Sequence, residues 1–326
     1  MNKKGSLTGL GKVYGFTLIQ LLKNKSNLIS FGIIIIAAIA AVPVMSVFMG
    51  GGSAETAVFY TDVTTVEAFL GEDEVGFDAR YFIQYAYSIV VMMICIFACT
   101  YIVRSIIEEK SSKLVETLLV SIRSDAMILG KIMAIITFIF FMFMLIAAGF
   151  GLSYLVTGMF TDTSFIGEKL ASVGLDSGII NIGSDLAVVV VISLLLACIA
   201  LSQIAALSGA GCSSMEDMES ANMAATMIIL VCYMVTVFIT PLGSGAAVFM
   251  SLCPFLSSFA APAYYAAGDI GMTIMIISWV IQIAVIAVIH KISGKVYDSL
   301  IMYKGSRLKM ARILSMAMGR KGENDK

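Results

Sequence analysis

The side chains that most often do chemistry in proteins are scarce in this sequence. Its single histidine, His290, stands beside Lys291 at the end of a long apolar run, and one histidine cannot form the HExxH motif of zinc proteases. Asp269 and Asp298 flank the last apolar run on opposite sides, whereas a paired-carboxylate site needs its two acids within reach of each other. The sequence therefore predicts no catalytic site.

Nucleotide and metal sites are not expected either. The Gly-Lys pairs at 11–12, 130–131 and 294–295 lack the upstream Gly and the following Ser or Thr of a phosphate-binding loop. Cys95 and Cys99 share a helix face at i, i+4, but no His, Asp or Glu stands near them, so they are interpreted as core residues. We expect this chain to bind no metal and no cofactor.

Charge gathers in one short segment, EEKSSKLVETLLVS (108–121), of a chain that is only 13% charged. Its apolar positions recur at helical spacing: Leu114, Val115, Leu118, Leu119 and Ile122. The other side carries Glu109, Lys113 and Glu116, with Glu109 and Lys113 in the favourable i, i+4 order. Such a helix fits either a contact that transmits force from a soluble partner or a solvated connection, and the pattern alone favours neither.

Long apolar runs surround this segment. The chain is 59% hydrophobic, and seven runs without charge approach the roughly 20 residues of a spanning helix. The runs are 28–49, 81–103, 132–157, 186–207, 221–240, 246–267 and 271–289. The sequence therefore predicts an all-α polytopic membrane protein.

The basic residues predict the topology. All Lys and Arg except Arg80 and Lys169 lie in three segments, which are the lead, 104–131 and the tail after 290. Because cytoplasmic segments carry the excess of Lys and Arg, these three segments and both termini are predicted to be cytoplasmic. An even number of crossings must then join the termini, so one of the seven runs does not span.

The run 246–267 is the candidate for the segment that does not span. Pro254 and Pro262 interrupt it, and proline removes a backbone donor inside a helix. We interpret the run as a re-entrant hairpin that includes Ser257 and Ser258. The alternative, a kinked seventh span, would place the basic tail outside.

The chain thus divides into a cytoplasmic lead (1–27), a transmembrane domain (28–290) and a cytoplasmic basic tail (291–326). The six predicted spans cover about 28–49, 81–103, 132–157, 186–207, 221–240 and 271–289, with outer loops 50–80, 158–185 and 241–270. In the lead, Leu10, Val13, Tyr14, Leu18 and Leu21 recur at helical spacing. Lysines among them predict an amphipathic helix at the cytoplasmic interface.

The predicted spans contain no Asp, Glu, Lys or Arg. Proton-coupled carriers usually need such a group at membrane depth, so proton coupling is disfavoured. Polar neutral side chains remain, among them Gln84, Gln203, Asn222 and Gln282. Sodium sites can be built from carbonyls and hydroxyls, so the argument against sodium coupling is weaker.

The segment EEKSSKLVETLLVSIRSDAMILGK (108–131) resembles the signature between spans two and three of type-2 ATP-binding-cassette (ABC) exporter permeases, particularly the sodium-efflux-type branch. The matching elements are Glu108-Glu109-Lys110, Val115-Glu116-x-Leu118-Leu119, Ser121 and Gly130-Lys131. Lys23-Asn24-Lys25-Ser26 of the lead and Cys253-Pro254-Phe255-Leu256-Ser257-Ser258 of the hairpin resemble the same branch.

The resemblance implies a permease subunit of an ABC exporter in the cell membrane, driven by a separate ABC ATPase subunit that holds ATP and magnesium. It implies a homodimer or heterodimer of permeases and no nucleic-acid partner. The implied coupling helix, which would dock on the ATPase, contains Glu108, Glu109, Lys110, Lys113, Leu114, Glu116, Leu118 and Leu119. The implied hairpin residues are Pro254, Ser257, Ser258 and Pro262. An autonomous ion-coupled secondary transporter and a membrane scaffold or immunity protein are the alternative interpretations.

Overall fold

The structure is a computed structural model that describes residues 9–49, 79–112, 124–160, 184–212, 214–239 and 244–301. All regular structure in these ranges is helical. The elements in chain order are α1 (Leu10–Lys23), α2 (Lys25–Met49), α4 (Ala79–Ser111), α6 (Ser124–Phe160), α8 (Ser184–Ala210), the 3₁₀ helix η1 (Met215–Asp217), α9 (Met218–Ile239), α10 (Ser244–Leu252), α11 (Ser257–Ala266) and α12 (Met272–Ile301).

Among the described residues, which are helical wherever they are regular, six helices are long and apolar enough to cross a bilayer, as the six predicted spans require. Their apolar stretches are Asn27–Val44, Gln84–Ser111, Ala126–Phe160, Asp185–Ala210, Met215–Phe238 and Met272–Gly294. The seventh apolar run falls on α10 and α11, which have only 9 and 10 residues. Neither helix is long enough to cross a bilayer alone.

Two helices extend well past the span ends predicted from charge. The run 81–103 stops at Arg104, but α4 continues to Ser111, and α12 continues beyond 289 to Ile301. The loss of hydropathy marks a change of surroundings rather than a helix end, because Glu, Lys and Arg are good helix formers. Residues 108–110 therefore belong to the end of α4, which corrects their placement in a separate helix.

The chain forms two compact units, each described here by itself. The smaller unit contains α2, the first residues of α4 and the second half of α6. Ser153 of α6 donates a hydrogen bond to the Ile39 carbonyl of α2 at 2.6 Å. A Cβ at Gly149 would lie 3.2 Å from the Ala38 Cβ. Small residues of this kind let two helix backbones approach closely in lipid.

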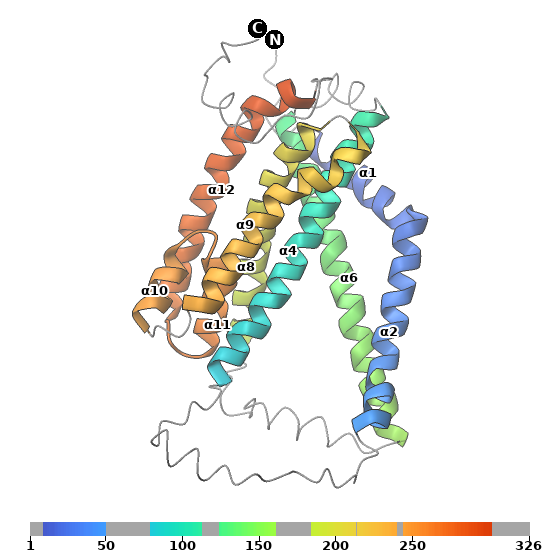
Figure 1. Cartoon of the computed structure of the whole chain (residues 1–326), viewed down its shortest axis with the longest axis vertical. Coiled ribbons are helices and arrows are strands. Elements are labelled where there is room, and N and C mark those ends of the chain that lie inside the picture. The colour runs from blue at the N-terminus through green and yellow to red at the C-terminus, as the bar shows by residue number, and fades with distance from the viewer. Residues whose placement is uncertain are drawn as a thin grey trace. The chain divides into compact units, whose positions relative to one another are not determined.

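The larger unit contains α1, most of α4, the first part of α6, and all elements from α8 to α12. In this unit α8 packs along α9 and α12, α11 packs on α8 and α12, and α10 packs on α11 and α12. The C-terminal ends of α4 and α8 and the start of α6 meet at one end of the unit, and α10 and α11 lie at the other (Figure 1). The two ends of α4 therefore reach two different sets of contacts.

Candidate functional site

Two ion pairs involve the end of α4. One helical turn apart, Arg104 Nε and Glu108 Oε1 form an ion pair at 2.7 Å. Both side chains are about one-third exposed, at 36% and 31%. An i, i+4 pair with this exposure adds a few tenths of a kcal/mol to helix stability. This pair supports the last turns of α4 without fixing them to another helix.

The next residue does fix α4 to another helix. Glu109 forms an ion pair with Lys131 of α6, and the two side chains are 2% and 0% exposed. Removing two charges from water costs several kcal/mol per ion, which their mutual attraction offsets only when both are present. The pair therefore specifies one register of α4 against α6, because any slip would leave a charge buried alone.

A third contact ties the same turn to α8. Lys110 Nζ donates a hydrogen bond to the Ala210 carbonyl oxygen at 2.7 Å. Ala210 is the last residue of α8, where carbonyl groups have no donor within the helix. A lysine there satisfies a carbonyl and complements the negative end of the helix dipole. We call Glu109, Lys110, Lys131 and the Ala210 carbonyl the α4 junction.

The helix α1 lies against α6 beside this junction. A Cβ at Gly130, the residue before Lys131, would lie 3.0 Å from both the Leu10 carbonyl oxygen and the Val13 Cβ. Any side chain at position 130 would have to push α1 away by a few tenths of an ångström. In α1, the helix of the lead, Val13, Thr17 and Leu21 are buried, and the predicted amphipathic character of the lead stays a prediction. Its location at a membrane interface stays a prediction.

The predicted coupling residues separate into two groups. Glu108, Glu109 and Lys110 belong to α4, whereas Lys113, Leu114, Glu116, Leu118 and Leu119 lie outside the described residues. The Glu109 carboxylate is buried against Lys131, so it is not available for the predicted docking contact, and the docking role of the other residues stays a prediction. Lys131 was not recognised as the partner of Glu109, although the Gly130-Lys131 pair stands out in the sequence.

The predicted hairpin residues lie at the opposite end of the same unit. Pro254 is in the turn between α10 and α11, where the sequence analysis predicted a break. Ser257 and Ser258 begin α11, and all three of Ser257, Ser258 and Pro262 are buried. Pro262 lies inside the helix instead of ending it. The re-entrant course itself stays a prediction.

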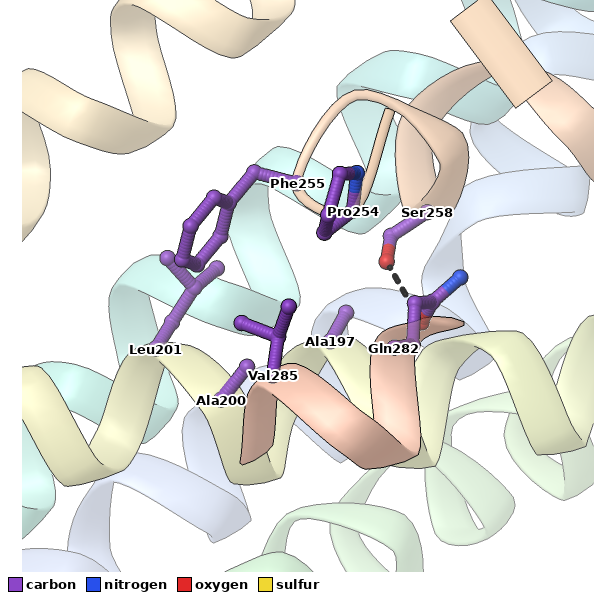
Figure 2. Close-up of a pocket in the computed structure, with 8 residues that line it drawn as sticks. All are labelled: Ala197, Ala200, Leu201, Pro254, Phe255, Ser258, Gln282 and Val285. Carbon is purple, nitrogen blue, oxygen red and sulfur yellow. Dashed lines mark hydrogen bonds between the residues drawn. The ribbon is translucent and has the colours of Figure 1, made fainter. Parts of the chain in front are cut away.

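Gln282 of α12 holds the start of α11. Its Nε2 donates to Ser257 Oγ at 2.7 Å, and its Oε1 accepts from Ser258 Oγ at 3.3 Å. Figure 2 shows the Ser258 contact at the edge of a hollow that is otherwise apolar, lined by Ala197, Ala200, Leu201, Pro254, Phe255 and Val285. The hollow has room for about one water molecule, so it holds no substrate-sized space.

Two further hydrogen bonds between side chains join the helices of this unit, and the sequence did not indicate either pairing. Tyr265, just before the end of α11, donates its hydroxyl proton to Asp185 Oδ2 of α8 at 2.7 Å, and this bond raises the pKa of Tyr265. Asn222 Nδ2 of α9 donates to Thr100 Oγ1 of α4 at 2.7 Å. In the sequence, these residues were visible only as polar residues in or beside apolar runs, which does not indicate their partners. Among the described residues, no three His, Cys, Asp or Glu side chains form a group that could hold a metal ion.

We expect the Gln203→Met variant to be more stable than the wild type. Gln203 of α8 is 0% exposed, and within the described part of the chain neither of its amide atoms has a hydrogen-bond partner. Removing an unsatisfied buried amide should raise the free energy of unfolding by about 1–3 kcal/mol. Thermal unfolding in detergent measures the change. The matched Gln282→Met variant should be destabilised, because that amide is bonded on both sides; a loss of stability in both variants would contradict the prediction.

Comparison with known proteins adds one finding. Residues 76–292 match the family model described as "ABC-2 family transporter protein". The match begins just before α4 and ends within α12, so it includes the α4 junction, α10 and α11. No curated protein and no solved structure matches the chain.

Proposed function

Since the family match covers more than half of the chain, this protein belongs to the ABC-2 family of transporter proteins, and from that premise we propose that it is an exporter permease driven by a separate ATPase subunit. Membership makes the chain a multi-pass membrane permease of an ABC transporter. Such permeases generally work with an ABC ATPase subunit. The proposal adds that transport is outward. It also adds the segment through which the ATPase would drive the movement of the permease.

The α4 junction is the observation that carries this proposal. Residues 113–123 connect α4 to α6, and Glu109 and Lys131 join those two helices on either side of the connection. Lys110 also joins α4 to the end of α8. A push on the connecting residues would therefore move the ends of these helices together instead of bending one of them.

The distribution of charge supports the cytoplasmic placement of this connection. The lead, the region 104–131 and the tail hold all but two of the basic residues, so both termini would lie in the cytoplasm. An ATPase in the cytoplasm could then reach residues 113–123, with ATP and magnesium bound on that subunit. The complex would contain two permeases, identical or related, in the cell membrane. The resemblance to the sodium-efflux-type branch makes sodium one candidate cargo, and a path without charged side chains suits hydrophobic drugs, peptides or lipids at least as well.

Charge reversal in the connecting segment tests the docking role. Lys113→Glu with Glu116→Lys preserves the net charge but inverts the pattern that a partner would meet. We expect at least about tenfold less ATPase subunit to co-purify, because like charges across an interface cost more than 1.4 kcal/mol. ATP-driven transport in vesicles should fall with it.

A matched control makes the same two kinds of change elsewhere. Lys12→Glu with Glu219→Lys alters exposed residues of α1 and α9 and should leave assembly near the wild-type level. Full assembly and transport in the Lys113/Glu116 variant would rule out docking through this segment. An equal loss in both variants would assign the effect to general surface charge.

A further inference from the structure

Pro262 changes the hydrogen bonding of α11. In an α-helix, the residue at position 262 would donate its N–H to the carbonyl of residue 258. Proline has no N–H, and its ring crowds the carbonyl four residues before it. The Ser258 carbonyl therefore has no donor at position 262 within α11. A buried carbonyl without a donor is costly, and most costly where water is excluded.

A neighbouring helix supplies the missing donor. Tyr87 of α4 donates its hydroxyl proton to the Ser258 carbonyl oxygen at 3.0 Å. In the same turn, Gln84 Nε2 donates to the Phe259 carbonyl at 2.8 Å, and Ser88 Oγ lies 3.0 Å from that oxygen. Gln84 and Ser88 are buried. The first turns of α4 thus form hydrogen bonds to two consecutive backbone carbonyls of α11, those of Ser258 and Phe259.

These hydrogen bonds between α4 and α11 differ from ordinary apolar packing of helices. Apolar side chains allow helices to shift against each other with a small change in contact area, whereas a hydrogen bond is lost within a short displacement. The Gln282 contacts hold the Ser257 and Ser258 side chains from α12. The Tyr87 contact holds the Ser258 backbone from α4. Only the second contact uses the carbonyl that Pro262 makes available.

The helix that makes this contact also carries the α4 junction. α4 has 33 residues and contains no glycine or proline, so it has no built-in kink. Tyr87 and Glu109 are separated by about 33 Å at 1.5 Å per residue. A displacement of α4 at the Glu109 end therefore reaches the Tyr87 end along one continuous helix.

We propose that Tyr87 is a positioning residue that fastens α11 to α4 through the Ser258 carbonyl freed by Pro262, so that α10 and α11 move with α4 during transport. The inference rests on the proposed function for the origin of the movement. The contact itself is independent of that function. The proposal predicts that removing the Tyr87 hydroxyl impairs transport only when residue 262 is proline. Mutations at both positions can test this dependence.

A double-mutant cycle isolates this relation. Tyr87→Phe removes the donor, and Pro262→Ala restores a backbone N–H that can bond to the Ser258 carbonyl within α11. In the complex reconstituted with its ATPase, with sodium as the transported probe, each single variant should lower the amount of sodium transported per ATP by about two- to tenfold, the range for one net hydrogen bond. In the Pro262→Ala background, Tyr87→Phe should have no further effect. Tyr154→Phe, at an exposed tyrosine of α6, is the matched control.

Cys253 provides a readout of the movement itself. It lies just before Pro254 and is partly exposed, whereas the other five cysteines are buried. Its labelling rate with a small maleimide should differ with and without Mg-ATP in the wild type, and the difference should shrink in both single variants. Cys253→Ser identifies the labelled position, and thermal unfolding of each variant separates a loss of coupling from misfolding.

The outcomes distinguish the two proposals. Losses that multiply in the double variant, an inert Tyr87→Phe variant, or Cys253 labelling that ignores ATP would each overturn the fastening of α11 to α4. A wild-type complex that performs no ATP-driven transport would overturn the proposed function instead. Equal losses in the single and double variants, with wild-type behaviour of Tyr154→Phe, would establish the contact.

Discussion

Lys131→Met is expected to lower the free energy of unfolding by about 3–5 kcal/mol, because it leaves the Glu109 carboxylate buried without its cation. The double variant Glu109→Met with Lys131→Met should recover most of this loss, since two apolar side chains of similar volume remove both desolvation costs. Thermal or denaturant unfolding of the purified protein in detergent measures both effects. Such a recovery would show that the ion pair adds little net stability and that its main effect is to specify the register of α4 against α6.

The neighbouring ion pair offers a matched control. Arg104→Met breaks a pair on the same helix whose side chains are about one-third exposed, and it should cost less than about 1 kcal/mol. A loss in Lys131→Met no larger than that in Arg104→Met would show that water reaches the Glu109 site. If the double variant stays as unstable as the single variant, the pair itself contributes net stability.

Gly130→Leu is expected to displace α1 from α6 and to cost about 1–3 kcal/mol through overpacking. The first side-chain atom would already lie 3.0 Å from a backbone oxygen of α1, which cannot move without moving that helix. Faster cleavage by trypsin after Lys12 or Lys23, together with a lower unfolding midpoint, would report the displacement. Both lysines are exposed residues of α1.

Gly151→Leu is the control for this substitution in the same helix. No atom lies within 4 Å of the position that its Cβ would occupy, and leucine favours a helix over glycine by up to about 1 kcal/mol. The control should therefore be neutral or slightly stabilised, with unchanged trypsin cleavage. Equal behaviour of the two variants would contradict a close contact between α1 and Gly130.

The spanning helices were predictable because the bilayer imposes two simple requirements on the chain. A bilayer excludes charges and forces the backbone into helices, so charge-free runs near 20 residues indicate spanning helices. The division of the seventh apolar run into α10 and α11 was also predictable, because proline interrupts a helix and Pro254 stands at the turn between them. The end of α4 was not predictable from these requirements, because Arg104, Glu108 and Lys110 continue the helix while ending its hydropathy.

The pairing of polar residues required the three-dimensional structure. Glu109 reads in the sequence as one charge of an exposed helical face, and only the packing of α4 on α6 places it beside Lys131. Tyr87 and Ser258 are far apart in the chain, and their contact meets a carbonyl that has no backbone donor at Pro262. Helical periodicity identifies which face of a helix is polar, but it contains no information on which other helix that face meets.

The buried pair also constrains the order of events during biosynthesis. Glu109 leaves the ribosome before Lys131 has been translated, so α4 carries a carboxylate without its cation until α6 follows. A single ionised side chain is unfavourable in a helix entering the bilayer. The Glu109 carboxylate can therefore take its buried position only once Lys131 is available, so we expect the end of α4 to reach its final packing together with α6. A nascent chain that stops before α6 would leave the Glu109 carboxylate without the cation that neutralises it in the folded protein.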